Sequence, residues 1–537
     1  MKKLFTLAFL CLFALNSFAQ ELGTLNAEFG TDGAVVFDPT SSHDFMYKVL
    51  VQEDGKIITV GRARLDSKNY SIYVSRHNAD GTLDDMYGDG GYVFLKVDPL
   101  IYLNSAYDAD LGEDGYLYIT GYTYDYTNNT AFVICLDENG FENEDYGDKG
   151  YVVSEYGGGI VYEAIDVDSK GRAVVAGYIN DQILVTRYNA KGKLDQTFGD
   201  KGTVIVNLGE NYYGNAFDVK VEESGKIVAV ATLYEETEEG TVIYSCIFRL
   251  KSNGELDNTF AENGYLLLYA GEYAEYALSV SIQPDGKYLV GGHDELWSET
   301  PELPRYESFI VRVNTDGTID KTFGTDGFVK FEPFEGDGCT NSCDVVLAAP
   351  DGQIFGAVYS YNFVTLASRA YVYNLDSNGQ LKEDFAGSGI MALPRFTEDE
   401  NEVYAMSLAL KDNKNLLVGG YNPVGDNWNS KLFIADINVD IKDGNDEGNE
   451  DDTTSVVGNY ENRFNIHPNP ATTTISIEGG LNDNAQVSII DLTGRCVKEI
   501  EISGAVSTIN IEDVESGIYF ISVKQNDNNF VEKLVVK

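Results

Sequence analysis

The sequence predicts an all-β protein: a seven-bladed β-propeller closed by its own N-terminal strand, followed by a small C-terminal β-sandwich. Three observations predict this fold. A turn of the form Gly-x-Leu-Asp-x-x-Phe-Gly recurs with drift seven times, each repeat holds four short apolar runs, and the piece that the last repeat lacks stands at the N-terminal end. Four antiparallel strands per repeat are typical of a propeller blade, and a closed ring leaves no long unpaired edge.

The recurring turn, called the signature turn below, sets the period. Its clearest copy runs from Gly192 to Gly202, and every copy carries an aromatic residue six places after its first glycine. These residues are Phe29, Tyr87, Tyr146, Phe198, Phe260, Phe323 and Phe385, at steps of 58, 59, 52, 62, 63 and 62. A period near sixty, seen seven times, indicates one blade per repeat.

Each repeat contains the same four strand-like runs. In the first repeat they span 46–51, 57–60, 71–75 and 92–95, and Asp54-Gly55 forms the tight hairpin turn between the first two. The second run ends in a small residue, such as Gly61, which predicts a bend or a close approach of another backbone segment.

The two ends of the array complement each other. The seventh repeat stops at Asp440, before its signature turn and fourth strand, whereas residues 23–33 and 34–37 supply a turn and a strand before the first complete repeat. We therefore expect residues 34–37 to complete the last blade.

Composition restricts the partners. With 86 acidic and 38 basic residues the net charge is −48, which repels nucleic acid phosphates and anionic lipid. Solubility outside the cell is the simple interpretation of this acidity, and divalent-cation binding by acidic loops is the alternative. Residues 1–19 read as a signal peptide with cleavage between Ala19 and Gln20, and no later segment is long and apolar enough to span a membrane.

These features divide the chain into four parts: a signal peptide (1–19), the propeller (20–440), an acidic linker (441–463) and a C-terminal module (464–537). The linker is a charge run without apolar spacing, so it is expected to be solvated and extended.

The propeller region resembles the delta-60 repeat family of bacterial secreted propellers. The matching segments include residues 187–199, with their Leu-Asp-x-x-Phe-Gly turn, and residues 283–292, with their Asp-Gly-Lys hairpin. The resemblance implies the fold but no chemistry, so it transfers no catalytic residue.

The C-terminal module resembles the type A sorting domain of the type IX secretion system of Bacteroidetes-type bacteria. The motifs that carry the resemblance are Pro468-Asn469-Pro470, then Gly494-Arg495, then Gly517 and Tyr519 before the last hairpin. The resemblance implies export through the type IX machinery to the cell surface or the medium, with or without cleavage of the module.

The polar and sulfur-bearing residues give few candidates for a metal or redox site. Cys339 and Cys343 could close a small surface disulfide in an oxidising compartment, and no zinc cluster is evident. The repeated aspartates allow a weakly supported calcium interpretation, but we expect each to cap its own turn: Asp84, Asp195, Asp257 and Asp320. No resident cofactor is predicted.

Binding residues are expected where the repeats differ. The loops that lead from each fourth strand to the next first strand are rich in tyrosine and should surround one mouth of the central channel: Tyr102, Tyr156, Tyr212, Tyr213 and Tyr273. Exposed tyrosines suit sugar stacking or a protein partner, and packing between blades is the alternative. Insertions after second strands, such as 232–241, are assigned to the opposite face or the periphery.

The sequence contains no recognisable catalytic constellation. Its four histidines are scattered, and acidic residues occur in every loop, so no general acid–base pair can be selected. The sequence therefore favours an exported, non-enzymatic binding propeller for a glycan or a protein. A polysaccharide-acting hydrolase or lyase on the same scaffold, and a structural or adhesion protein of the surface, are the alternatives.

Overall fold

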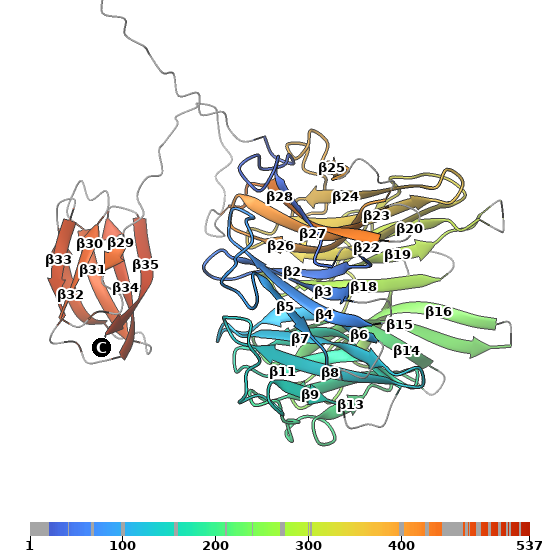
Figure 1. The fold of residues 1–537 in the computed structure, drawn as a ribbon, viewed down its shortest axis with the longest axis horizontal. Coiled ribbons are helices and arrows are strands. Elements are labelled where there is room, and N and C mark those ends of the chain that lie inside the picture. Colours follow the sequence, from blue (N-terminus) through green and yellow to red (C-terminus); the bar gives the residue numbers. More distant parts are fainter. Residues whose placement is uncertain are drawn as a thin grey trace, which may run out of the picture. The chain divides into compact units, whose positions relative to one another are not determined.

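The computed structural model describes two parts of the chain. In the first part it covers residues 21–442 except 41, 66–68, 98–102, 155–158, 210–211, 239, 269–273, 299, 301–302, 397–401 and 425–428. In the second it covers residues 465–467, 471, 473–478, 485–491, 496–502, 506–511, 514, 517–525 and 528–536. The chain divides into two compact units, Met1–Glu447 and Gly448–Lys537. Every regular element in the described residues is a strand (Figure 1).

The first unit consists of seven four-stranded antiparallel sheets. Blade 1 holds β2 (Phe45–Val51), β3 (Ile57–Arg64), β4 (Tyr70–His77) and β5 (Tyr92–Leu95), and blade 2 holds β6 (Leu103–Leu111), β7 (Leu117–Tyr124), β8 (Asn129–Leu136) and β9 (Tyr151–Val153). Blade 3 holds β10 (Ile160–Val167), β11 (Ala173–Ile179), β12 (Gln182–Tyr188) and β13 (Thr203–Ile205), and blade 4 holds β14 (Tyr212–Val221), β15 (Ile227–Thr237), β16 (Gly240–Leu250) and β17 (Tyr265–Leu268).

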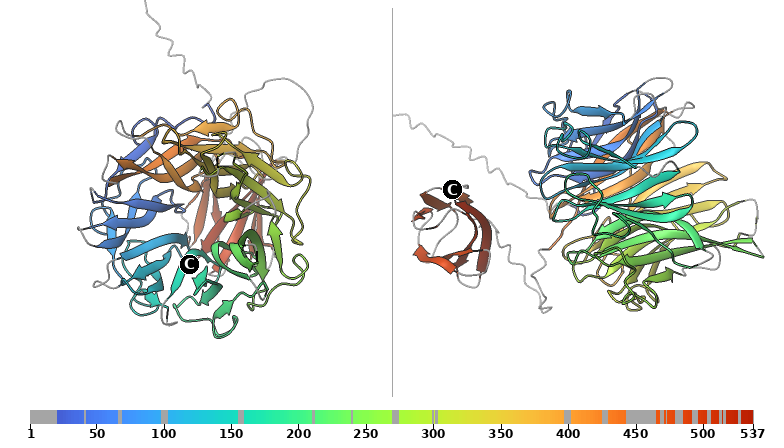
Figure 2. Two further views of the ribbon diagram at one scale, coloured as in Figure 1. Left: turned by 90° about the vertical axis from the view of Figure 1, so that its right-hand side faces the viewer. Right: turned by 90° about the horizontal axis from the view of Figure 1, so that it is seen from below.

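The remaining blades follow the same order. Blade 5 holds β18 (Glu275–Ile282), β19 (Tyr288–Glu295), β20 (Tyr306–Val313) and β21 (Phe328–Phe331), and blade 6 holds β22 (Cys339–Ala348), β23 (Ile354–Asn362), β24 (Ala367–Leu375) and β25 (Ile390–Ala392). Blade 7 holds β26 (Tyr404–Leu410), β27 (Asn415–Val424), β28 (Asn429–Asn438) and β1 (Ala34–Phe37). The sheets stand side by side in a ring around a central axis (Figure 2, left), so the predicted seven-bladed propeller is confirmed.

The fourth strand of blade 7 comes from the N-terminal segment. β1 pairs antiparallel with β28, with Ala34 opposite Ala435 and Phe37 opposite Leu432. Upstream of this strand, the amide of Gly23 donates to the carbonyl of Asn438 over 2.8 Å. The first and last repeats are thereby joined in one sheet.

The antiparallel pairing defines two faces of the ring. In blade 1 the start of β2 lies opposite the end of β3, with Phe45 facing Arg62 across the pair. The loop before each first strand and the loop after each second strand therefore lie on one face, called the loop face below. The Asp-Gly hairpins and the signature turns lie on the other, the turn face. The insertion at 232–241 extends the β15–β16 hairpin on the loop face, with Tyr213 opposite Tyr234, which corrects the expectation of the opposite face.

Each first strand carries a bulge opposite the second strand, and the register shift occurs at the same place in all seven blades. A bulge adds one residue to its strand and re-aims that side chain. In blades 1 and 7 a glycine accommodates it: a Cβ on Gly61 or Gly420 would lie 1.9 Å from the carbonyl oxygen of Phe45 or Tyr404. The small residue expected at this position is thus explained by close approach of the first strand's backbone.

The signature aromatic residues connect neighbouring blades. All seven are at most 1% exposed. Phe29, for example, packs under the turn of blade 1, where a Cβ on Gly81 would lie 2.9 Å from its ring. The amide of Gly30 also donates to the carbonyl of Asp80 over 2.9 Å. The turn that defines the repeat therefore joins each blade to the next.

The second unit contains two sheets. One consists of β29 (Asn465–His467), β30 (Thr474–Glu478) and β33 (Val506–Asn510), and the other of β31 (Ala485–Asp491), β32 (Cys496–Ile502), β34 (Gly517–Gln525) and β35 (Asn528–Val536). Buried residues of both sheets form one hydrophobic cluster, which includes Ile475, Ile509, Val487 and Leu534.

Candidate functional site

The repeated aspartates hold the scaffold together. In blade 4, Asp257 accepts hydrogen bonds from the amide of Thr259 at 3.1 Å and from its hydroxyl at 2.6 Å, which is the predicted turn cap. Its other carboxylate oxygen is bound by Arg249 Nε at 2.9 Å and by Lys226 Nζ at 2.9 Å. Burial opposes ionisation, but the hydrogen bonds from Thr259 and Lys226 and the charge of Arg249 outweigh it and lower the pKa of Asp257.

The arginine of this pair also contacts the next blade. Arg249 Nη1 donates to the carbonyl oxygen of Thr315 over 2.7 Å, and the guanidinium lies 4.8 Å from the centre of the Phe260 ring. The same pair with the same two additional contacts occurs in three other blades: Arg76–Asp84, Arg187–Asp195 and Arg312–Asp320. We call this arrangement the arginine latch.

Three blades replace both members of the latch together. Blade 2 has Cys135 and Asn143, whose amide nitrogen lies 3.6 Å from the sulfur, and blade 6 has Asn374 and Lys382. In blade 7 the aspartate position holds Asn26 and the arginine position holds Asp436, which pairs with Lys411 at 2.8 Å; this lysine lies 4.9 Å from the Phe29 ring centre. Among the described residues, no group of three metal-ligating side chains gathers.

The central channel is the space that residues of all seven blades line. Its cavity of about 490 Å³ is lined by residues of every first strand. The seven bulge residues, called the bulge ring below, all line it: Tyr47, Tyr107, Glu163, Phe217, Leu278, Asp344 and Met406. The repeated bulge thus places seven side chains of six kinds along the channel wall.

Most charges in the channel wall are paired. Lys48 binds Asp108 at 2.8 Å, and Lys220 lies 3.3 Å from Asp166 and 3.8 Å from Asp218. These carboxylates also accept amide hydrogen bonds from the next blade, as Asp218 does from Val280 at 2.8 Å. They therefore join adjacent first strands.

Glu163 and Asp344 of the bulge ring differ from these acids. Burial alone raises the pKa of Glu163 to about 7, and among the described residues no hydrogen bond or ion pair reaches its carboxylate. Burial raises the pKa of Asp344 to about 6, although the hydroxyl of Ser342 at 2.5 Å opposes the shift. Carboxyl groups with pKa values near neutrality are typical of functional sites.

A short hydrogen-bonded chain leads away from Asp344. The Ser342 hydroxyl that contacts Asp344 also lies 2.9 Å from Nδ1 of His293. His293 is stacked between Tyr276 and Tyr306, with ring centres 4.8 and 5.1 Å away, and burial lowers its pKa to about 4. The carboxylate contacts the serine and not the histidine, so these residues do not form the Ser-His-Asp arrangement of a hydrolase.

Aromatic rings follow one another around the loop-face side of the channel. They form a chain of contacts with centre distances between 4.4 and 6.5 Å, through Tyr359, Tyr404, Tyr421, Phe45, Tyr47, Tyr107 and Tyr122. Burial and then the nearby Glu163 carboxylate raise the pKa of Tyr107. Sequence reasoning missed this chain because its members lie within strands.

The predicted binding tyrosines are only partly placed. Tyr102, Tyr156 and Tyr273 lie outside the described residues. Tyr212 and Tyr213 begin β14 and pack on their own blade: Tyr212 contacts Tyr244 with ring centres 5.9 Å apart, and Tyr213 stacks on Tyr234 at 5.4 Å. Both are half-buried.

The loops after second strands present a more exposed apolar surface. Their tips carry Tyr126 (69% exposed), Trp297 (59%) and Phe363 (47%) in blades 2, 5 and 6. Further exposed apolar residues on loop-face tips are Leu65, Val242, Val364 and Leu366. We call these seven residues the apolar rim. They lie at the tips of five blades on the same face, where a large ligand could contact several of them at once.

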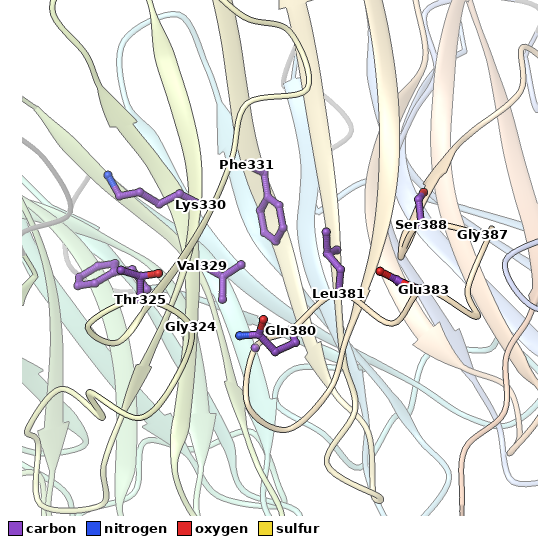
Figure 3. Close-up of a pocket in the computed structure, with 12 residues that line it drawn as sticks. Gly324, Thr325, Val329, Lys330, Phe331, Gln380, Leu381, Glu383, Gly387 and Ser388 are labelled. Atoms are coloured by element: carbon purple, nitrogen blue, oxygen red, sulfur yellow. The ribbon is translucent and has the colours of Figure 1, made fainter.

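Hollows on the turn face and the periphery are bounded by scaffold residues. One of about 940 Å³ includes Lys226, Arg249 and Tyr288, which belong to the latch of blade 4 or contact it. Another, of about 870 Å³, lies between β21 and the signature turn of blade 6. There Val329, Phe331 and Leu381 face one another, and Lys330 points away (Figure 3).

The proposed disulfide is a correction. Cys339 and Cys343 are both free and buried on β22. Residues four apart in an extended strand are separated by roughly 13 Å, whereas a disulfide needs Cα atoms about 4.4–6.8 Å apart. The pair therefore cannot form a bridge.

The terminal motifs are described only in part. Ala19 and Gln20, the triplet 468–470, and the pair Gly494-Arg495 lie outside the described residues. Gly517 begins β34, and Tyr519 belongs to the core of the second unit. No helix in the described part of the chain is long and apolar enough to cross a membrane.

Comparison with known proteins identifies both repeat and tail. Residues 465–537 match the model of a secretion system C-terminal sorting domain, and residues 52–85 and 283–323 match that of a domain of unknown function (DUF5122) beta-propeller. Both resemblances seen in the sequence are thus confirmed. No curated protein matches the sequence.

Several solved structures are distantly similar to this chain. One is a protein of unknown function from Dyadobacter fermentans DSM 18053, with 14% identity, a TM-score of 0.39, and coverage of 75% of this chain and 98% of that chain. Another is polysaccharide lyase Uly1, with 8% identity, a TM-score of 0.42, and coverage of 79% and 94%. A third is the β-propeller domain of the Trilobed protease from Pyrococcus furiosus, with 8% identity, a TM-score of 0.37, and coverage of 77% and 99%. Likeness at this level carries no inference about activity.

Proposed function

We propose that this chain, which joins a seven-bladed β-propeller to a secretion system C-terminal sorting domain, is an exported binding protein of the cell surface or the medium. Residues 1–19 would serve as the signal peptide, 20–440 as the binding propeller, 441–463 as the linker and 464–537 as the sorting module. The type IX machinery is the partner in export, and the binding module acts after it.

The apolar rim on the loop face is the observation that carries the binding role. Tyr126, Trp297 and Phe363 extend from three different blades and are all about half exposed or more. Aromatic side chains with polar surroundings stack on sugar rings and anchor protein partners. The ligand is therefore a glycan or a protein surface bound across several blades.

The ligand is sought with the full mature chain in two assays. One is a glycan array, and the other is a cross-linking pull-down from the culture medium and the cell-surface fraction. A Y126A/W297A/F363A variant should lose at least about tenfold in affinity for the ligand found, because each truncated anchor costs on the order of 1 kcal/mol or more. The matched control is M86A/F141A, which removes two residues that are 81% and 58% exposed on the turn face and should leave affinity unchanged. Equal losses in both variants would contradict binding through the rim.

A polysaccharide-acting enzyme is the second candidate, and one observation favours it. Glu163 and Asp344 line the same channel with pKa values raised to about 7 and about 6, as a general acid at neutral pH requires. Incubation with a polysaccharide panel, read out as new reducing ends and as unsaturated ends, tests it. Product formation that E163Q abolishes would replace the binding proposal with an enzymatic one.

A further inference from the structure

The bulge ring places two acids among aromatic and apolar residues. The other five members are Tyr47, Tyr107, Phe217, Leu278 and Met406, so apart from its two carboxyl groups this level of the channel is lined by aromatic and aliphatic side chains. A carboxylate beside tyrosine faces is the environment that recognises an organic ammonium group, through charge and through cation–π attraction.

Among the described residues Glu163 has no lysine partner, in contrast to Asp108 and Asp218 of the same channel. Lys48 binds Asp108 of the next blade, and Lys220 binds Asp166 of the preceding blade and lies near Asp218 of its own strand. Five carboxyl groups and two lysines line the cavity, so the lining carries an excess of negative charge when its acids are ionised. A positively charged ligand would supply the missing counter-charge.

The positions of the two acids restrict the ligand's shape. Glu163 belongs to blade 3 and Asp344 to blade 6, so they are three blades apart in a ring of seven and lie nearly opposite each other across the channel. A ligand that contacts both acids therefore needs a cationic group at each end. The cavity of about 490 Å³ suits a small molecule.

We propose that the channel binds a small organic diamine, with one ammonium group at Glu163, beside the ring of Tyr107, and the other at Asp344. A calcium ion fits less well. Calcium takes six to eight oxygen ligands, whereas the residues beside Glu163 in the ring are aromatic, and no group of three metal-ligating side chains gathers in the described residues. This site lies inside the channel and is separate from the apolar rim.

Calorimetric titration of the full mature chain tests the proposal with 1,4-diaminobutane, 1,6-diaminohexane and, as the single-charge reference, butylamine. At least one diamine should bind about tenfold more tightly than butylamine.

The variants test which residues bind the diamine. E163Q and D344N should each lower diamine affinity about tenfold. Y107L should also lower diamine affinity, whereas Y107F, which keeps the aromatic ring, should not. The control E255Q removes an exposed acid on the turn face that pairs with Lys251, and should change nothing.

Thermal unfolding of each variant shows that it is folded. Absence of diamine binding would overturn the proposal. An equal loss of diamine affinity in E255Q would also overturn it, because the diamine would then be attracted by the protein's overall negative charge. Titration with calcium alone is the third arm: tight calcium binding that E163Q abolishes would assign the site to a metal instead. The Y126A/W297A/F363A variant should bind diamine as the parent does. Loss of diamine binding in the channel can therefore be told apart from loss of ligand binding at the apolar rim.

Discussion

Arg249 Nε lies 2.9 Å from Oδ2 of Asp257, and the same guanidinium reaches the carbonyl oxygen of Thr315 in the next blade. One side chain thus fixes its own signature turn and holds the adjacent blade. Because the pair recurs in four blades, the most regular part of the repeat is explained by the need to join blades, and not by a ligand.

Breaking one latch should destabilise the propeller. We expect R249L to lower the free energy of unfolding by about 3 kcal/mol, because Asp257 then keeps only Lys226 as a charged partner in a buried site. Urea unfolding followed by tyrosine fluorescence measures the loss. K251A, two residues away in an exposed pair, should stay within about 0.5 kcal/mol of the parent. A similar loss in both variants would contradict the latch.

The latch aspartates should make the propeller sensitive to acid. The pKa values of Asp84, Asp195, Asp257 and Asp320 are lowered in the folded state, so folding holds these groups ionised where the unfolded chain binds protons. This stabilisation is complete above the unfolded pKa of about 3.9 and is lost as pH falls through the folded values. Melting temperatures between pH 6 and pH 2 should fall steeply below about pH 4, and less steeply in D257N. Parallel curves for the two proteins would show that Asp257 contributes nothing to acid sensitivity.

Glu163 should have the opposite effect. Its folded pKa of about 7 exceeds its ordinary value, so the folded protein retains a proton that the unfolded chain has lost, and stability declines as pH rises between about 4.5 and 7. E163Q should therefore be more stable than the parent by about 2 kcal/mol at pH 8 and equal to it at pH 4. Chemical unfolding at the two pH values gives the comparison. Greater stability of the parent at pH 8 would mean that Glu163 has a cationic partner in the free protein.

The pairing of β1 with β28 can be tested by cross-linking. Val35 lies directly opposite Ile434, so a V35C/I434C variant should form a disulfide on mild oxidation, because such pairs have Cβ atoms about 5 Å apart. Non-reducing peptide mass mapping detects the bridge. In V35C/F433C the two side chains lie on opposite faces of the sheet, and no bridge should form. Equal cross-linking in both variants would argue against this register.

Export should depend on the sorting domain. Deleting residues 465–537 should trap the propeller in the periplasm, because the match to the secretion system sorting domain covers this segment. Cell fractionation followed by immunoblotting measures the distribution. Normal surface display of the shortened chain would contradict the assignment.

The repeat made the scaffold predictable, since seven copies of one turn set the period and the missing fourth strand located the ring's seam. The channel residues could not be predicted, because their positions depend on the bulge in each first strand. The bulge inserts one residue into each first strand, so the buried residues on either side of it are three apart, as Met46 and Val49 are. The two-residue alternation fails there, and it does not place Glu163 and Asp344 on the channel wall. The free cysteines were misassigned because their four-residue spacing reads as a loop, whereas Cys339 begins a long strand.

The residues of the apolar rim were not among the candidates chosen from the sequence. Tyrosine-rich loops before first strands were favoured, yet Tyr212 and Tyr213 continue the strand and pack on the β15–β16 hairpin. Tyr126 and Trp297 occur singly in their loops, and only the antiparallel pairing places them on one face. A search for isolated aromatic residues after second strands could have found them.

Binding through the loop face is tested most directly by side-chain oxidation with hydroxyl radicals, with and without the ligand found on the array. Trp297, Tyr126 and Phe363 are exposed on the loop face, and Met86 and Phe141 on the turn face serve as internal references. We expect the ligand to lower oxidation of the three rim residues and to leave oxidation of Met86 and Phe141 unchanged. Protection confined to the turn-face residues, with the rim oxidised at the same rate as in the free protein, would contradict binding through the loop face.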